Sequence, residues 1–171
     1  LDMPPLPLFK RRGQSSPYGG DDLRAGFSLD FWLLLESSVA GLVLLDTRLE
    51  NGQGLLVQST GNGQLEIAIS DGRTQNSWDC DPHSLEVGKL HHVTIVVDGG
   101  AKIISFIIDG RLGDGGEFRQ FGWGRFSPHL RHANGGDRLI VDRSVCALRV
   151  YGRYLRTSEA VGNFRAGGPQ R

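Results

Sequence analysis

Two stretches of the sequence place a tryptophan among planar polar side chains, a combination that suits contact with a sugar ring. Around Trp78 the neighbours are Arg73, Gln75, Asn76 and Asp79, and around Trp123 they are Arg119, Gln120 and Arg125. An indole offers a flat apolar surface to the C–H face of a sugar, while carboxylate, amide and guanidinium groups bond to its hydroxyls. The sequence therefore predicts ligand contacts from the following residues: Trp78, Asn76, Arg73, Asp79, Trp123 and Arg119.

The alternative for both tryptophans is burial between a loop and a sheet, because large aromatic side chains are mostly buried in folded proteins. Trp78 is expected to be the more exposed of the two, since Asn76, Ser77 and Asp79 beside it are polar. Trp123 lies close to Phe121 and Phe126 and is expected to join a small apolar core within its loop.

Catalysis of glycoside hydrolysis is not predicted. A retaining glycosidase needs two carboxylates roughly 5 Å apart, which on one strand requires acidic residues two or four positions apart. No glutamate of the chain has such a partner within a predicted strand. Asp79 and Asp81 flank Cys80 just before Pro82, where aspartate commonly bonds to its own local backbone. We therefore expect a protein without enzymatic activity.

Zinc chemistry is also not predicted. His91 and His92 are adjacent on a predicted strand and point to opposite faces, so they cannot hold one ion together. Cys80 with His83, and His129 with His132, have workable spacing but lack the third and fourth ligands that zinc requires. Calcium takes oxygen ligands from loops, and aspartates stand at several turns and strand ends, although turn chemistry alone accounts for them. They are Asp21, Asp22, Asp46, Asp71, Asp114, Asp137 and Asp142.

The elements that must position these residues are short strands. Residues 85–112 predict a hairpin, because two β-branched runs flank Asp98-Gly99-Gly100-Ala101. Both faces of this hairpin are apolar, so we expect it in the middle of a sheet, with another layer over one face and loops over the other. Further strands are predicted at 27–35, 41–46, 54–58, 64–70, 138–141 and 145–151. Residues 158–164 predict one short helix with Thr157 as its N-cap, and Trp32 is expected to be buried.

Composition predicts one all-β domain of many short strands, since 25 of the 171 residues are glycine and no long helical periodicity occurs. Residues 1–20 read as a lead-in or linker with a possible edge strand around 6–9, and residues 21–171 as the domain. Nineteen basic residues balance nineteen acidic ones, which argues against nucleic acid and against an anionic membrane as partners. No apolar run is long enough for membrane insertion. Cys80 and Cys146 either form a disulfide or are two free, buried thiols.

Two segments carry a family resemblance. "VGKLHHVTIVVDGGAKIISFIIDGRL" and "CALRVYGRYLRTSEAVGNFRAG" resemble the LamG-like jelly-roll domains of the concanavalin A-like lectin and glucanase superfamily. The match extends from Phe27 to Ala166, and its motifs concern the fold more than chemistry. Leu90 and the Cys146-Ala147 pair depart from the family pattern, which often has tryptophan and an acidic pair there.

The resemblance implies a fold and a function. The fold is an all-β, two-sheet antiparallel jelly-roll β-sandwich with one short C-terminal helix. The function is non-catalytic, lectin-like carbohydrate binding, in a module appended to a secreted polysaccharide-active enzyme. It further implies a structural calcium ion, a glycan or polysaccharide ligand, neighbouring domains in a larger protein, and a secreted or cell-surface location. The alternative is a structural or protein-interaction domain that has no glycan ligand.

Overall fold

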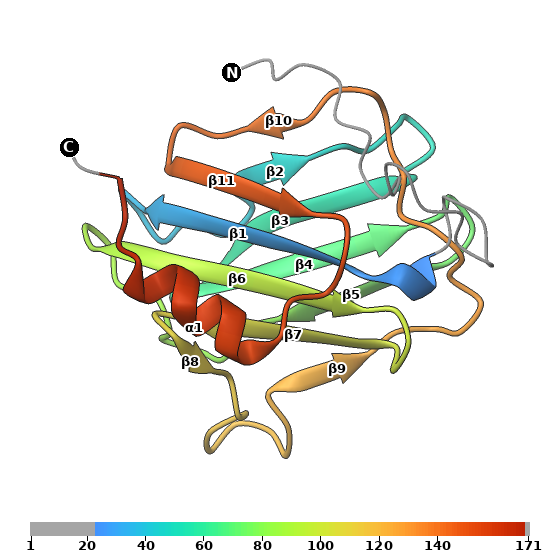
Figure 1. Ribbon diagram of the computed structural model, residues 1–171. Coiled ribbons are helices and arrows are strands. Elements are labelled where there is room, and N and C mark those ends of the chain that lie inside the picture. The colour runs from blue at the N-terminus through green and yellow to red at the C-terminus, as the bar shows by residue number, and fades with distance from the viewer. Residues whose placement is uncertain (1–22, 170–171) are drawn as a thin grey trace.

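Strands β6 (Leu90–Asp98) and β7 (Ile103–Ile108) form the predicted hairpin. They pair antiparallel from Val93 opposite Ile108 to Asp98 opposite Ile103. In this computed structural model, which describes residues 23–169, the hairpin lies inside one of two antiparallel sheets (Figure 1). The prediction of a mid-sheet hairpin is therefore confirmed. The predicted lead-in at 1–20, with its edge strand, lies outside the described residues.

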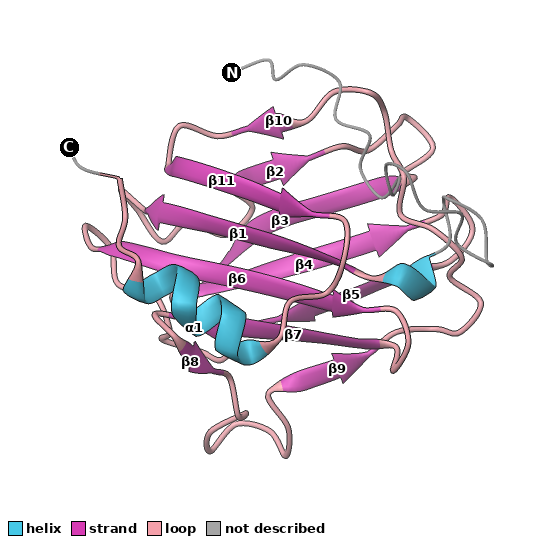
Figure 2. Cartoon of the chain, viewed as in Figure 1, coloured by secondary structure: helices cyan, strands magenta, loops and turns pink. Residues whose placement is uncertain are grey.

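The two sheets face each other as a sandwich (Figure 2). The first has the order β11 (Val145–Tyr151), β1 (Phe27–Leu34), β6, β7 and β8 (Arg111–Leu112), with β9 (Trp123–Arg125) also paired to β7. The second has the order β10 (Ile140–Val141), β2 (Val43–Asp46), β3 (Gly54–Gly61), β4 (Gln64–Ser70) and β5 (Gln75–Asp79). A 3-10 turn (Leu23–Ala25) precedes β1, and the one described α-helix, α1 (Thr157–Arg165), follows β11. The all-β jelly-roll prediction is confirmed.

Alternate residues of the strands fill the space between the sheets. Phe27, Leu29, Phe31 and Leu33 of β1 are at most 1% exposed, and they belong to one apolar cluster with Leu65, Ile67 and Ile69 of β4. Because side chains of a strand alternate between its two faces, this pattern fixes which face of each strand is internal. It also fixes that Trp32 and His92 point away from the sandwich interior.

Helix α1 covers the outer face of the first sheet, where loops were expected (Figure 1). Trp32 is buried there, as predicted, beside Phe164 at 6.1 Å and His92 at 4.9 Å between ring centres. The buried carboxylate of Asp30 accepts hydrogen bonds from Thr94 Oγ1 at 2.8 Å and Asn163 Nδ2 at 3.0 Å. The helix is thus held to the sheet by polar contacts as well as by ring packing.

Several local predictions need correction. Arg156, with extended backbone, is the N-cap of α1, and Thr157 is its first helical residue. Residues 75–79, which lie outside the strands predicted from the sequence, form strand β5. Of the two alternatives left open for the cysteines, the structure has no disulfide between Cys80, which is buried, and Cys146, which is half-buried.

Candidate ligand-binding site

Arg119 holds the end of β5 to the loop between β8 and β9. Its Nη1 donates to Asp79 Oδ1 at 2.9 Å, and its Nη2 donates to the Asp79 carbonyl at 2.6 Å and to Asp81 Oδ1 at 3.0 Å. The guanidinium carbon lies 4.3 Å from the centre of the Trp78 ring. A guanidinium that bonds carboxylates with two nitrogens while stacking on an indole combines two favourable contacts in one side chain.

Trp78 is enclosed by this loop. Its Nε1 donates to the Gly122 carbonyl at 3.4 Å, and its ring lies so close to Gly124 that a Cβ there would come within 2.2 Å of Cε3. Trp78 also packs against the apolar cluster between the sheets. It is therefore a half-buried packing residue of β5 and not an indole displayed at the rim, contrary to the expectation from its polar neighbours.

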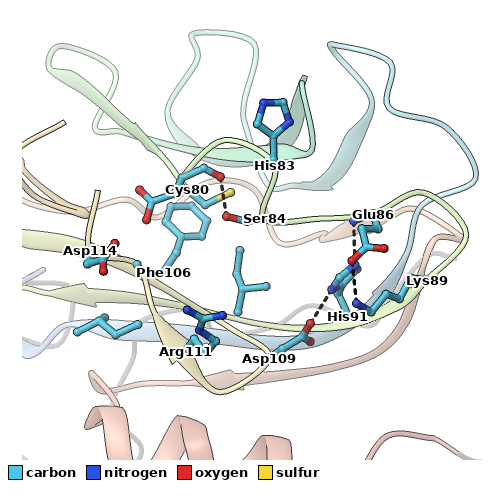
Figure 3. Close-up of a pocket in the computed structure, with 14 residues that line it drawn as sticks. Cys80, His83, Ser84, Glu86, Lys89, His91, Phe106, Asp109, Arg111 and Asp114 are labelled. Carbon is cyan, nitrogen blue, oxygen red and sulfur yellow. Dashed lines mark hydrogen bonds and ion pairs between the residues drawn. The ribbon is translucent and has the colours of Figure 1, made fainter. Parts of the chain in front are cut away.

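Next to the group formed by Trp78, Asp79 and Arg119, a polar pocket of about 390 Å³ opens between the segment that follows β5 and the ends of β7 and β8 (Figure 3). Asp81 lines this pocket and is also bonded to Arg119 through one carboxylate oxygen. Its other carboxylate oxygen accepts from the Gly115 N–H at 3.1 Å. Phe106, Ile108 and Leu112 supply apolar surface, and the remaining lining residues are Cys80, Asp81, His83, Ser84, Glu86, Lys89, His91, Asp109, Arg111, Gly113 and Asp114.

Some charged groups of the pocket are already paired. His91 Nδ1 lies 2.7 Å from Asp109 Oδ2, and His91 Nε2 accepts from the Glu86 N–H at 2.9 Å. Because Nε2 is an acceptor, His91 carries its proton on Nδ1 and donates it to Asp109. Lys89 Nζ lies 2.8 Å from Glu86 Oε1, and this hydrogen bond lowers the pKa of Glu86 and raises that of Lys89.

Other groups of the pocket remain available to a ligand. The exposed Arg111 side chain makes no hydrogen bond or ion pair within residues 23–169. Asp114, also exposed, accepts from the Gly116 N–H at 2.9 Å and from no other group of the described residues. His83 and the exposed Phe118 face each other with ring centres 6.4 Å apart. The pocket thus presents a free donor, a carboxylate acceptor and nearby ring surfaces.

The structure brings some of the predicted ligand-contacting residues together and separates the others. Trp78, Asp79 and Arg119 form one cluster. Asn76 is on the same strand, but its Oδ1 accepts from the Ser127 N–H at 2.8 Å. Arg73 is exposed in the turn between β4 and β5. Trp123 stands on β9 and does not join an apolar loop core. Their contact with a ligand stays a prediction.

Sequence reasoning did not select the pocket residues. Asp109 was not singled out, and Asp81 was interpreted only as a residue bonding to its local backbone. Segments 80–91 and 106–114 come together through pairing of β4 with β5 and of β6 with β7, which no local pattern reports. The one local signal was the dense alternation of charged and small residues after each of these strands.

A calcium site does not assemble from the described carboxylates. Within residues 23–169, no group of three or more His, Cys, Asp or Glu side chains could hold a metal ion. Asp46 is paired with Arg48 at 2.7 Å, and Asp71 and Asp142 accept from backbone N–H groups two residues further on. These contacts are the turn chemistry that the sequence offered as the alternative. Calcium binding through other oxygens stays a prediction.

The fold and its pocket define a lectin-like antiparallel jelly roll. The chain belongs to the Laminin_G_3 family, described as the concanavalin A-like lectin/glucanases superfamily, whose family model matches residues 13–160. No curated protein matches the chain significantly. No helix among the described residues is long and apolar enough to cross a membrane.

Similar solved structures are binding domains of botulinum neurotoxins. The binding domain of neurotoxin DC in complex with rat synaptotagmin II superposes with a TM-score of 0.65 at 14% identity, covering 85% of this chain and 36% of that one. The same domain in complex with SialylT superposes with a TM-score of 0.62 at 13% identity, covering 84% of this chain and 36% of that one. A third structure is of botulinum neurotoxin type C, whose cell entry is described as dependent upon interaction with two ganglioside molecules. It superposes with a TM-score of 0.61 at 16% identity, covering 85% of this chain and 36% of that one. The chain thus spans little more than a third of these chains, and the likeness shows the fold.

Proposed function

We propose that this domain is a non-catalytic glycan-binding module and that the pocket of Figure 3 holds the sugar. One observation carries the proposal. Free polar groups of opposite hydrogen-bonding type, Arg111 and Asp114, stand around an apolar wall formed by Phe106, Ile108 and Leu112. A sugar has the matching surface, with hydroxyls that both donate and accept and a C–H face that is apolar.

The carboxylates of the pocket suit binding better than acid–base catalysis. Asp81 is bonded to Arg119 and Gly115, and Asp109 is bonded to His91 and to the His92 N–H at 2.8 Å. Both carboxylates are thus already engaged by donors of the protein, whereas a glycosidase needs a carboxyl group placed to transfer its proton to the glycosidic oxygen. We therefore expect a bound glycan to be released unchanged.

The comparisons support a binding role without naming the ligand. One similar toxin domain is titled as a complex with SialylT and another as dependent on gangliosides, so the jelly-roll architecture is compatible with glycan recognition. The structures compared are toxin domains and not domains of polysaccharide-active enzymes. Attachment to a secreted enzyme, contact with neighbouring domains, and a secreted or cell-surface location therefore remain predictions.

Protein interaction is the second candidate. Leu112 lines the pocket and is 50% exposed, and Phe118, whose ring lies 6.4 Å from that of the lining residue His83, is 63% exposed, so the two offer apolar surface that a protein partner could cover. A protein partner would bury these two side chains and would not need the hydrogen-bonding groups inside the pocket.

A glycan array probed with the purified domain, with and without calcium, tests the proposal. We expect binding to a subset of glycans, and loss of that binding in Arg111→Gln and Asp114→Asn. Arg143→Gln, at an exposed arginine beside β11 that does not line the pocket, is the matched control and should bind normally. Incubation with a bound glycan should yield no shorter products. If a correctly folded domain binds no glycan on the array, the protein-interaction alternative is favoured.

A further inference from the structure

Phe121, Trp123 and Arg125 form a row of side chains at every second residue along β9 and the residues just before it. Trp123 is opposite Ser105 of β7, and Arg125 is opposite Ile103. The neighbours of Ser105 on β7, Ile104 and Phe106, are buried in the core between the sheets. Alternation on the paired strands therefore turns this row toward the outer face of the first sheet.

The same alternation separates this row from the Trp78 cluster. Gly124, between Trp123 and Arg125, faces inward onto the Trp78 ring. Trp123 belongs to neither of the apolar clusters, and Phe121 is 47% exposed. The contacts of helix α1 on this sheet, with Trp32 and His92 as well as Val96 and Ile107, do not include the row, and β9 lies to one side of the helix in Figure 1.

The row combines stacked rings with a cation. The ring centres of Phe121 and Trp123 are 4.8 Å apart with 26° between their planes, and the guanidinium carbon of Arg125 lies 5.9 Å from the Trp123 centre. The exposed Arg125 guanidinium makes no hydrogen bond or ion pair with any residue in the described range 23–169. A guanidinium with its donors free binds a planar carboxylate with two parallel hydrogen bonds.

We propose that this row is a second glycan contact site, specific for an acidic sugar. The apolar face of the sugar ring packs on the Phe121–Trp123 stack, and its carboxylate bonds to Arg125. The charge argues for this ligand over a neutral sugar, because a neutral ring leaves the guanidinium without an anionic partner. It also distinguishes the site from the pocket of Figure 3, whose carboxylates would repel an acidic sugar.

The inference rests on the proposed glycan-binding function but uses different residues, so the two can fail separately. The test is calorimetric titration with two matched probe pairs: sialyllactose against lactose, and a galacturonic acid trimer against its methyl ester. We expect at least one acidic probe to bind more tightly than its neutral counterpart. Arg125→Gln should weaken the acidic probe roughly 10- to 100-fold, the range for a hydrogen bond to a charged group, and leave the neutral probe unchanged. Phe121→Ala should weaken both members of the pair.

Two further variants make the assignment specific. Trp123→Phe keeps a ring in the stack and should retain acidic binding while abolishing the ligand-induced fluorescence change, whereas Trp78→Phe should leave that change in place. Arg143→Gln, an arginine paired with Glu36 beside β11 at the opposite edge of the sheet, is the charge-matched control.

The outcomes separate cleanly. Equal affinity for acidic and neutral probes, or acidic binding that survives Arg125→Gln, overturns the acidic site. If neutral glycans bind, Asp114→Asn abolishes that binding, and no acidic probe binds more tightly than its neutral counterpart, the pocket is supported and the row is refuted. Acidic binding that depends on Arg125 but not on Asp114, together with no binding of any neutral glycan, supports the row and refutes the pocket. Absence of binding to both probe classes, and to the glycan array, refutes both.

Discussion

The Arg119 guanidinium covers the Trp78 ring, with its carbon 4.3 Å from the ring centre, and joins two segments that are 40 residues apart in the sequence. The same guanidinium is bonded to Asp79 and Asp81, so one side chain fixes the β5 end, the pocket carboxylate of Asp81 and the loop that carries Asp114. Arg119 was predicted to contact ligand. That contact stays a prediction, and the geometry shows in addition that Arg119 positions the pocket wall.

Replacement of Arg119 by alanine should therefore destabilise the fold. Loss of the stacking contact and of hydrogen bonds to carboxylates should together cost about 2–4 kcal/mol of the free energy of unfolding. Arg119→Lys keeps the charge but loses the planar fork, and should fall between alanine and wild type. Urea denaturation measures both variants. Arg143→Ala, whose side chain is 82% exposed, should change stability by less than about 0.5 kcal/mol, and an Arg119→Ala effect as small as that would contradict the assignment.

A methyl group at Gly124 should have a comparable effect on the same contact. The added Cβ would come within 2.2 Å of Trp78 Cε3, so either the indole or β9 must move, at a cost of about 1–3 kcal/mol. Gly162→Ala is the control, since a Cβ there meets nothing within 4 Å and alanine favours the helix. Melting temperatures should fall for Gly124→Ala and rise slightly for Gly162→Ala. Unchanged melting of Gly124→Ala would mean that Trp78 is not packed as described.

These contacts show where sequence reasoning succeeded and where it did not. The β6–β7 hairpin was predictable because its β-branched alternation and its Gly-rich turn are local features. The burial of Trp32 was also predictable, although the partner on its outer face, Phe164 of α1, was not. Strands β8 and β9 have two and three residues, too few for a period to show.

The two other tryptophans were ordered wrongly for a physical reason. Polar neighbours suggested that Trp78 is exposed, but strand alternation turns Ser77 outward and Trp78 inward. Phe121 and Phe126 suggested a shared loop core for Trp123. Phe126 is instead 3% exposed and packs between the sheets, while Phe121 stacks on Trp123 at the surface. The pairing of β5 with β4 decides the direction of Trp78, and the pairing of β9 with β7 decides that of Trp123.

The two thiols should react at different rates. Cys80 is 1% exposed, and burial raises its pKa to about 11, so at pH 8 only about one molecule in a thousand carries the reactive thiolate. Cys146 is half-buried on β11 and should be the thiol that a chromogenic disulfide reagent labels in the native protein. We expect one thiol per chain without denaturant and two with it. In Cys146→Ser the native count should fall to zero, and a native count of two would show that Cys80 is accessible.

The ion pair at the start of α1 predicts a dependence of stability on pH. Glu159 accepts from Arg153 through both carboxylate oxygens, at 2.7 and 2.9 Å, and from the Arg156 N–H at 2.9 Å. The hydrogen bonds from Arg153, followed by that from Arg156, lower the pKa of Glu159 from 4.5 to about 2. A carboxyl group whose pKa is lower in the folded state stabilises that state at pH values above the unfolded pKa. This stabilisation is lost as the pH falls from about 4.5 to about 2.

Comparison of wild type with Glu159→Gln isolates this contribution. Their melting temperatures should differ by a constant amount from pH 7 to about pH 5, and the difference should shrink as the carboxylate of the wild type becomes protonated, vanishing near pH 2. Added salt should reduce the difference at neutral pH, since the pair is at the surface. Glu117→Gln, an exposed glutamate that makes no ion pair among the described residues, should show no such pH-dependent difference from wild type. A Glu159→Gln difference that persists undiminished at pH 2 would show that it arises from helix packing and not from the ionised pair.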